Sequence, residues 1–258
     1  IGSYFNNYNG DGSWFGGYAS NLRFVQGTAI YSGSTYTIPT APLTAVSGTQ
    51  FLSSMTNANI PDYSMISNVE TISSAQVNTS IKKFGTGSIY RGSTSTTNDS
   101  GLYLANTPSL RSGNFTIECW IYRTVDTNDV EQFAVTRRSA SGGWAFAVYG
   151  ATDKLGFYTD LNSVWNQGST TISLNTWYHV AVTRSGNTFR LFVNGNLDGT
   201  FTDTSDFTDG EVWLFRRYAA SGGNYYPFIG YVDDFRITKG YARYTTSFTP
   251  PTEAFKNK

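Results

Sequence analysis

Hydrophobic and polar residues alternate with a period of two along most of the second half of the chain. In FTIECWIYR, residues 115–123, Phe115, Ile117, Cys119 and Ile121 fall on one side of an extended backbone. The same alternation predicts further strands at 144–150, 154–160, 177–184, 189–195, 211–217 and 231–238. No helical pattern separates these strands, so the sequence predicts an all-β fold.

Turn residues separate the predicted strands. The tripeptide SGN at 185–187 joins two of the strongest strands, so residues 177–195 predict a β-hairpin. Asn194-Gly195 then supplies two positions that tolerate positive φ, as the next tight turn requires. Strands about 8–15 residues apart and joined in this way are typical of a two-sheet antiparallel sandwich or jelly roll.

One segment occurs twice. GYASNLRFVQGTAIY at 17–31 resembles GYVDDFRITKGYARY at 230–244 at a constant offset of 213, and after a one-residue slip YTIPTAPL at 36–43 parallels FTPPTEAF at 248–255. Only the second copy follows the body of a domain. We therefore expect residues 1–45 to be the terminal strand and tail of an upstream repeat, and residues 46–258 to form a complete domain.

An isolated terminal strand would expose unpaired backbone groups and one apolar face, formed by Tyr18, Leu22 and Phe24. We expect residues 1–45 to pack on the complete domain or to join a sheet of an adjacent chain by strand addition. The chain begins with Ile1 and has no signal-peptide pattern, so we expect it to be a fragment or a processed product.

Composition narrows the classes of function. The 258 residues include 14% charged and 16% aromatic side chains, and the formal net charge is zero. A neutral chain has no electrostatic means of capturing nucleic acid or an anionic membrane, and no apolar run approaches the roughly 18–20 residues of a membrane helix. Neither partner is expected.

The later motifs resemble the laminin-G-like group of concanavalin A-like domains. The similarity lies in KFGTGSIY…GLYLANTPSLRSGNFTIECWIY, in NTWYHVAVTRSGNTFRLFVNGNLDGT and in IGYVDDFRITKGYARYTTSFTPP, which together cover 80–258 in order. The resemblance implies a jelly roll of two antiparallel sheets, one of them concave. The ending RITKGYARYTTSFTPP is particularly similar to variants in tail-fibre and other virion proteins of tailed bacteriophages.

Members of this group bind glycans or proteins, and some branches hydrolyse glycans, so the fold does not choose among them. Hydrolysis needs two converging carboxyl groups, which the glucanase branch places on one strand as Glu-x-Asp-x-x-Glu. Here Glu118, Glu131 and Glu211 each stand alone. We therefore predict that the protein is not an enzyme.

Calcium is the candidate cofactor that the resemblance implies, bound by loop carboxylates at one rim of the sandwich. The densest loop is VDTNDVE, and its candidate ligands are Asp126, Asn128 and Asp129, with Glu131 beside them. A second acidic loop holds Asp203, Asp206 and Asp209. Neither loop has the spacing of an EF-hand, and both are also compatible with ordinary solvated turns.

Aromatic residues in loops and at strand ends are the candidate ligand-binding residues, because sugar rings stack on aromatic planes while amides bind their hydroxyl groups. The alternative is that these rings fill the core or interfaces between subunits, which we expect for Trp120, Trp177 and Trp213. The candidates are Trp144, Trp165, Asn166, Tyr218, Tyr225 and Tyr226.

Three further groups are interpreted as structural. Cys119 falls on the predicted core face and has nothing nearby that would activate its thiol. His179 is the only histidine, so a zinc site is unsupported. Asp233-Asp234 could bind a metal or an amide, but the first copy has Ser20-Asn21 there, which favours a role in positioning loops.

The leading functional hypothesis is a non-enzymatic module on the surface or an appendage of a virion, such as a phage tail fibre, that binds a host-surface glycan. An architectural module that decorates or cements the virion is the second hypothesis, with protein neighbours as its only ligands. A cellular extracellular adhesion module of the same fold is the third. The first two place the chain among other virion subunits, as a homo-oligomer outside the cell.

Overall fold

The structure is a computed structural model, and the part it describes is built from strands and turns. No helix long and apolar enough to cross a membrane occurs in that part. The chain divides into two units, residues 1–66 with 256–258, and residues 67–255. The described residues are 21–53, 69–93, 100–104, 107, 109–136, 142–208, 210–216 and 226–255.

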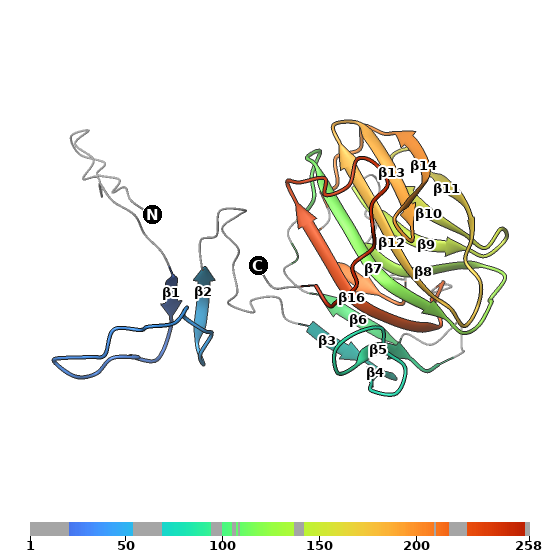
Figure 1. The fold of residues 1–258 in the computed structure, drawn as a ribbon. Coiled ribbons are helices and arrows are strands. Elements are labelled where there is room, and N and C mark those ends of the chain that lie inside the picture. Colours follow the sequence, from blue (N-terminus) through green and yellow to red (C-terminus); the bar gives the residue numbers. More distant parts are fainter. Residues whose placement is uncertain are drawn as a thin grey trace, which may run out of the picture. The chain divides into compact units, whose positions relative to one another are not determined.

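Residues 67–255 form a sandwich of two antiparallel seven-stranded sheets (Figure 1). We call them the β8 sheet and the β7 sheet after their central strands. In spatial order the β8 sheet contains β11 (Val164–Thr171), β10 (Lys154–Thr159), β9 (Trp144–Tyr149), β8 (Val130–Thr136), β15 (Val212–Leu214), β6 (Gly101–Leu104) and β3 (Val69–Ile72).

The β7 sheet contains, in spatial order, β14 (Asn196–Thr202), β13 (Thr188–Val193), β12 (Trp177–Ser185), β7 (Phe115–Arg123), β16 (Gly230–Lys239), β5 (Ser88–Arg91) and β4 (Ala75–Asn78). The predicted all-β sandwich is therefore confirmed. The predicted hairpin is present as β12 and β13, and the turn after it has positive φ at Asn194 (49°) and Gly195 (78°).

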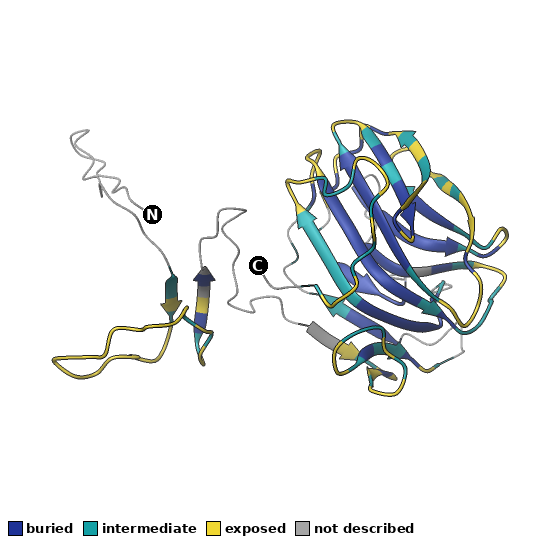
Figure 2. Cartoon of the chain, viewed as in Figure 1, coloured by how far each residue is buried: buried dark blue, intermediate teal, exposed yellow. Residues whose placement is uncertain are grey.

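The main core lies between the two sheets. Phe115, Ile117, Cys119 and Ile121 of β7 are completely buried in it, as their alternation predicts (Figure 2). Burial raises the pKa of the Cys119 thiol well above its usual value, with a further contribution from the charge of Glu118. The thiol is a packing group in the core, as predicted.

The outer face of the β7 sheet is covered by residues 240–255, which we call the C-terminal strap. Thr183 Oγ1 donates a hydrogen bond to the carbonyl of Tyr244 (2.8 Å), and the amide of Phe248 donates to the carbonyl of Gly195 (2.8 Å). A Cβ atom at Gly195 would lie 2.0 Å from the Phe248 carbonyl oxygen. The close approach and the positive φ both require glycine there.

Asp233 and Asp234 position loops, as the structural interpretation predicted. Asp233 Oδ2 accepts hydrogen bonds from the amides of Lys83 (2.8 Å) and Phe84 (3.1 Å). Asp234 Oδ2 accepts one from the amide of Phe255, at the end of the strap (2.9 Å). The acid pair thus fastens two separate segments to β16.

Glu118 lies fully buried beneath the strap at the centre of a polar cluster. Its Oε1 accepts hydrogen bonds from Arg236 Nε (2.9 Å) and Nη2 (2.7 Å), and its Oε2 accepts one from Tyr244 Oη (2.8 Å). His179 Nε2 lies 3.3 Å from the same Oε2, close enough for an ion pair when the imidazole is protonated. One carboxylate therefore joins β7, β12, β16 and the strap.

The other unit contains β1 (Leu22–Val25) and β2 (Thr49–Ser53), which pair as an antiparallel two-stranded sheet. The division between the units falls between residues 66 and 67, so β2 lies with β1. The boundary at 45/46 was inferred from the repeated sequence, and this division does not test it. The boundary therefore stays a prediction.

Candidate functional site

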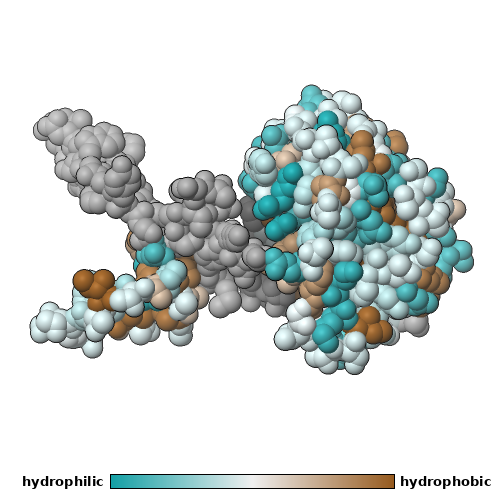
Figure 3. Space-filling view, viewed as in Figure 1, coloured by the Kyte–Doolittle hydropathy of each residue, from teal (hydrophilic) through white to brown (hydrophobic). Residues whose placement is uncertain are grey.

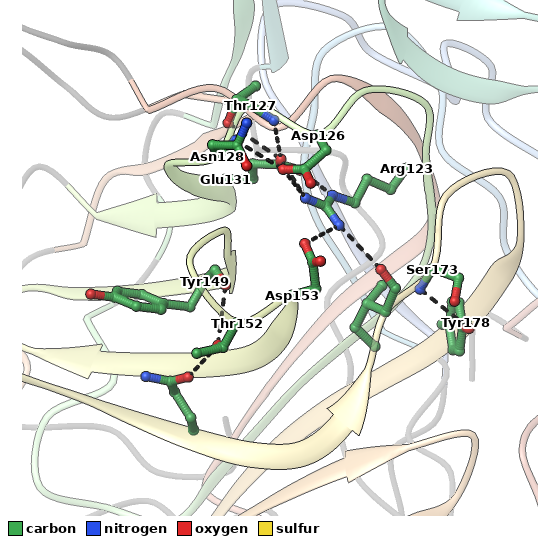
Figure 4. A network of polar contacts seen from close by, with 12 residues as sticks. Arg123, Asp126, Thr127, Asn128, Glu131, Tyr149, Thr152, Asp153, Ser173 and Tyr178 are labelled. Carbon is green, nitrogen blue, oxygen red and sulfur yellow. Dashed lines mark hydrogen bonds and ion pairs between the residues drawn. The ribbon is translucent and has the colours of Figure 1, made fainter.

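A buried arginine occupies the rim of the sandwich where the first acidic loop begins (Figure 4). Arg123, at the end of β7, forms a bidentate ion pair with Glu131. Its Nε donates to Oε2 (2.7 Å) and its Nη2 donates to Oε1 (2.8 Å). Its Nη2 also contacts Asp126 Oδ1 (2.8 Å), while Nη1 donates to Asp153 Oδ1 (2.6 Å) and to the carbonyl of Ile172 (3.2 Å). Three carboxylates and one carbonyl thus surround a single guanidinium group.

Electrostatics keeps this arginine charged despite its burial. Burial alone would lower the pKa of Arg123, but hydrogen bonds and charges from Glu131 and Asp153 outweigh it and raise the pKa above its usual value. The guanidinium is only 1% exposed, and Glu131 is fully buried. The Arg123–Glu131 pair is therefore neutral inside the rim, and Asp126 and Asp153 lie at its partly exposed border.

The loop predicted to bind calcium is organised by this arginine. Asp126 Oδ1 accepts from Arg123 and from the amide of Asn128, whereas the side chains of Asn128 and Asp129 lie exposed. In the described ranges no three His, Cys, Asp or Glu side chains form a group that could hold a metal ion. The described contacts do not support the predicted calcium ligands Asp126, Asn128 and Asp129, because the Asp126 carboxylate already binds Arg123.

The second acidic loop is also used internally. The buried carboxylate of Asp203 accepts hydrogen bonds from Thr159 Oγ1 (2.7 Å) and from the amide of Ser205 (2.6 Å). Asp206 forms an exposed ion pair with Arg111 (2.9 Å). Asp209 lies outside the described residues. Both described carboxylates of this loop thus bind protein groups, Asp203 in the interior and Asp206 at the surface.

Calcium is therefore expected to leave the protein unchanged. Isothermal titration of calcium chloride into chain pretreated with a chelator should give only heats of dilution, because Arg123 already binds oxygen atoms of all three rim carboxylates. The same titration into a chain bearing Asp126→Asn is the control and should be identical. A saturable heat in the intact chain that Asp126→Asn removes would contradict this expectation.

A line of directly paired residues crosses the outer face of the β8 sheet. Its members face away from the main core and lie opposite one another on successive strands, from β6 through β15, β8 and β9 to β10 and β11. We call it the aromatic row, and it consists of Tyr103, Trp213, Val135, Ala145, Tyr158 and Trp165. Four of its six members are aromatic, and the small ones lie in the middle.

One end of the aromatic row lies at β11, the edge strand of the β8 sheet. Trp165 of β11 contacts Tyr158 and Tyr149, with ring centroids 5.2 Å and 5.9 Å away. We call these three rings the Trp165 cluster; each is half-buried. Gly156 lies beneath the indole, and a Cβ atom there would come within 3.1 Å of the Trp165 ring. A glycine on β10 thus lets the indole lie close to the sheet.

Polar groups border the Trp165 cluster on the same face. Gln167 of β11 pairs with Gly156, so its side chain projects from the same side of the sheet as that of Trp165. The exposed Thr152 hydroxyl donates a 2.6 Å hydrogen bond to Gln167 Oε1. Aromatic planes beside an exposed amide are the combination that binds sugars through stacking and hydroxyl hydrogen bonds.

The structure places the predicted ligand-binding residues in different environments. Trp144 is only 1% exposed and packs in the main core, stacked on Phe157 at 5.9 Å, so its proposed ligand role was wrong. Trp165 lies in the cluster just defined. Asn166 is paired with the core residue Phe157, and alternation therefore directs it to the opposite side of β11 from Trp165. Tyr226 is half-buried with a φ of 45°, and Tyr218 and Tyr225 lie outside the described residues.

Tyr149 and Tyr158 are the candidate residues that the sequence analysis missed. Both occupy outward positions of predicted strands, where alternation alone marks them as ordinary surface residues. Their relation to Trp165 depends on the pairing of β9, β10 and β11. A search for aromatic residues at outward positions of consecutive strands would have found them.

The isolated glutamates do not form a catalytic pair. Glu118 and Glu131 are both fully buried, and each is held by an arginine, Arg236 and Arg123 respectively. General acid–base chemistry on a glycosidic bond needs two carboxyl groups that flank the substrate about 5–10 Å apart in an open site. Neither of these two glutamates faces such a site.

Comparison with known proteins places the chain in a family. The sequence model described as the concanavalin A-like lectin/glucanases superfamily, of the laminin G type, matches residues 96–243. The chain therefore belongs to that superfamily, and the predicted fold family is confirmed. No curated protein matches the chain.

Two solved structures illustrate the shared fold. Domain 4 of AbnA, a GH43 extracellular arabinanase from Geobacillus stearothermophilus solved with arabinotriose, is 16% identical, with a TM-score of 0.51 over 71% of this chain and 88% of that one. The binding domain of botulinum neurotoxin serotype D is 16% identical, with a TM-score of 0.50 over 75% of this chain. The match spans 46% of that neurotoxin chain. Such low identities establish the fold alone.

Proposed function

We propose that residues 67–255 form a non-enzymatic carbohydrate-binding module, and that the Trp165 cluster is where a sugar ring stacks. The observation that carries this proposal is the contrast between the two outer faces of the sandwich. The strap covers the outer face of the β7 sheet, whereas the β8 sheet carries half-buried aromatic rings beside an exposed amide. The complex of a similar fold with arabinotriose supports the same class of ligand.

The wider setting that we propose is the surface or an appendage of a tailed-bacteriophage virion, with a host-surface glycan as the ligand. Its support is the similarity of RITKGYARYTTSFTPP to endings of tail-fibre and other virion proteins. In this setting the chain is extracellular and lies among other virion subunits, in a homo-oligomer.

A purely architectural role in the virion is the second candidate. The observation that favours it is the edge of β1 that no strand of the described ranges pairs with, because an open strand edge is a protein-binding element. In that role the aromatic rings of the Trp165 cluster would contact neighbouring subunits.

Replacement of Trp165 by alanine is expected to weaken glycan binding about tenfold or more, which corresponds to ~1.4 kcal/mol or more. The reason is the loss of the largest ring of the cluster, while the rest of the β8 sheet stays paired. A glycan array with the intact chain would first identify a ligand, and titration calorimetry would then compare the variants.

Trp177→Ala is the matched control, since Trp177 is also half-buried but belongs to the β7 sheet, where it packs on Tyr122. Its binding should equal that of the intact chain. Equal losses in the two variants, or an intact chain that retains no glycan on the array, would argue against the module and for the architectural role.

A further inference from the structure

Strand β1 of the N-terminal unit has one edge paired with β2 and one edge that no described strand pairs with. The amide of Gln26 donates to the carbonyl of Gly48 (2.8 Å), so in β1 the backbone groups of residues 22, 24 and 26 face β2. Backbone groups alternate in direction along a strand, so those of Arg23, Val25 and Gly27 face the other edge. No strand among the described residues pairs with that edge.

The repeat shows what this edge does in a complete domain. In β16 the equivalents of Arg23, Val25 and Gly27 are Arg236, Thr238 and Gly240. The amide of Gly240 donates to the carbonyl of Asn114 (2.7 Å), and Arg236 and Thr238 lie opposite Glu118 and Thr116 of β7. The open edge of β1 is therefore the edge by which β16 joins β7.

The two copies of the repeated segment also share their backbone conformation, although β1 belongs to a two-stranded sheet and β16 to a seven-stranded one. The φ angle is 54° at Asn21 and 49° at the equivalent Asp234. It is 83° at Gly27 and 87° at the equivalent Gly240. These four left-handed residues give both copies the same bend, at Asn21 before β1 and at Asp234 within β16, and the same turn after the strand.

The segment after the strand is alike as well. Tyr31 stacks on Tyr36 with centroids 4.4 Å apart, and the equivalent Tyr244 stacks on Phe248 at 3.5 Å. The later stack is half-buried and packs on Phe192 of the β7 sheet, with centroids 6.1 Å and 5.4 Å away. The first copy is therefore already folded in the shape of a strap.

The first strap differs in that the described residues of its own unit do not cover its apolar rings. Tyr31 is 48% exposed, Tyr36 60% and Ile38 75%, and Figure 3 shows hydrophobic residues exposed on this unit. Arg23 donates to the carbonyl of Thr44 (2.8 Å), whereas the equivalent Arg236 binds the buried carboxylate of Glu118. Arg23, the open edge of β1 and the stacked rings of Tyr31 and Tyr36 are thus arranged as in the second copy. The sheet surface that the second copy contacts is not among the described residues of this unit.

We propose that residues 21–43 are the closing segment of a second laminin-G-like sheet, which they join by adding β1 beside its β7-type strand. The partner is a laminin-G-like unit whose β7-type strand lacks its β16 neighbour and carries a carboxylate opposite Arg23. Residues 67–255 are not this partner in the same chain or in a second copy, because β7 is already paired with β12 and β16 on its two edges.

A graft within the full chain tests whether the segment closes a sheet. Residues 234–255 are replaced by residues 21–43, so that Asn21 takes the left-handed position of Asp234 and Arg23 faces Glu118. We expect one cooperative thermal transition, with Tm within about 10 °C of the intact chain. The matched control is the same graft with Arg23→Glu and Gly27→Val, which opposes Glu118 with a second carboxylate and places a branched residue at positive φ.

The control is expected to lose the cooperative transition or to melt at least about 10 °C below the graft. A graft without a cooperative transition, or one that melts together with its control, would overturn the proposal. These readouts do not involve glycan, so they are independent of the proposed function.

Discussion

Replacing Arg123 with leucine is expected to lower the free energy of unfolding by about 3–5 kcal/mol, the typical cost of breaking a buried ion pair. Leucine fills much of the space but leaves Glu131 buried without its counter-ion, and leaves Asp126 and Asp153 facing the same gap. Urea denaturation at pH 7, followed by tryptophan fluorescence and by circular dichroism, measures the loss.

Arg111→Leu is the control for this experiment. Arg111 forms an ion pair with Asp206 at a similar distance, but the two side chains are 54% and 45% exposed. An exposed pair of this kind contributes about 0–1 kcal/mol, so the control should remain close to the intact chain. Comparable losses in the two variants would show that the rim network is not an internal ion cluster.

The rim network also explains how the acidic loop can be ordered without a metal ion. A calcium site needs several oxygen ligands around one cation, and here the oxygen atoms of three carboxylates and one carbonyl converge instead on the guanidinium of Arg123. The charge is attached to β7, so it folds with the core and does not depend on calcium concentration. The loop residues 126–131 are thereby connected to β10 and to the segment after β11.

Glu118→Gln is expected to cost about 2–3 kcal/mol at pH 7. This is less than the usual cost of breaking a buried pair, because Arg236 stays 25% exposed and keeps some solvation. The variant leaves Arg236 with a neutral partner and weakens the hydrogen bond from Tyr244, so the strap is held less firmly. Asp206→Asn, which neutralises an exposed carboxylate, is the control and should change little.

The loss should depend on pH in a defined direction. Burial raises the pKa of Glu118, but the contact with His179, the charge of Arg236 and the hydrogen bonds from Arg236 and Tyr244 outweigh it, so the pKa lies below its ordinary value of 4.5. A lowered folded-state pKa stabilises the fold above pH 4.5, and this contribution disappears as pH falls through the folded-state pKa. The stability difference between the intact chain and Glu118→Gln should therefore shrink between pH 5 and pH 3. A difference that stays constant over that range would contradict the assignment.

Sequence alternation predicted the central strands well, and it missed the short or polar ones. Residues 115–123 and 177–184 correspond to β7 and β12 almost residue for residue, because both strands are covered on both faces and are rich in branched and aromatic residues. β11 has the sequence VWNQGSTT and was not predicted. An edge strand needs few apolar side chains, so its own sequence resembles a loop.

The candidate site was only partly predictable for a related reason. Trp165 was found from its loop-like, polar surroundings, and Trp144 was chosen on the same grounds although it lies in the core. The glycine-rich segment before Trp144 says nothing about which face of β9 its ring occupies. That choice is made by the pairing of β9 with β8 and β10, which turns Ala145 outward and Trp144 inward.

The sequence by itself determined the all-β class, the strands of the core, the buried thiol of Cys119 and the repetition of the closing segment, because each of these depends on local alternation or on direct comparison along the chain. Only the tertiary structure decided that Arg123 binds the rim carboxylates, that Glu118 holds the strap, and that Tyr149, Tyr158 and Trp165 meet on one face. Those contacts join residues on different strands, and strand order and register arise from packing the whole sandwich.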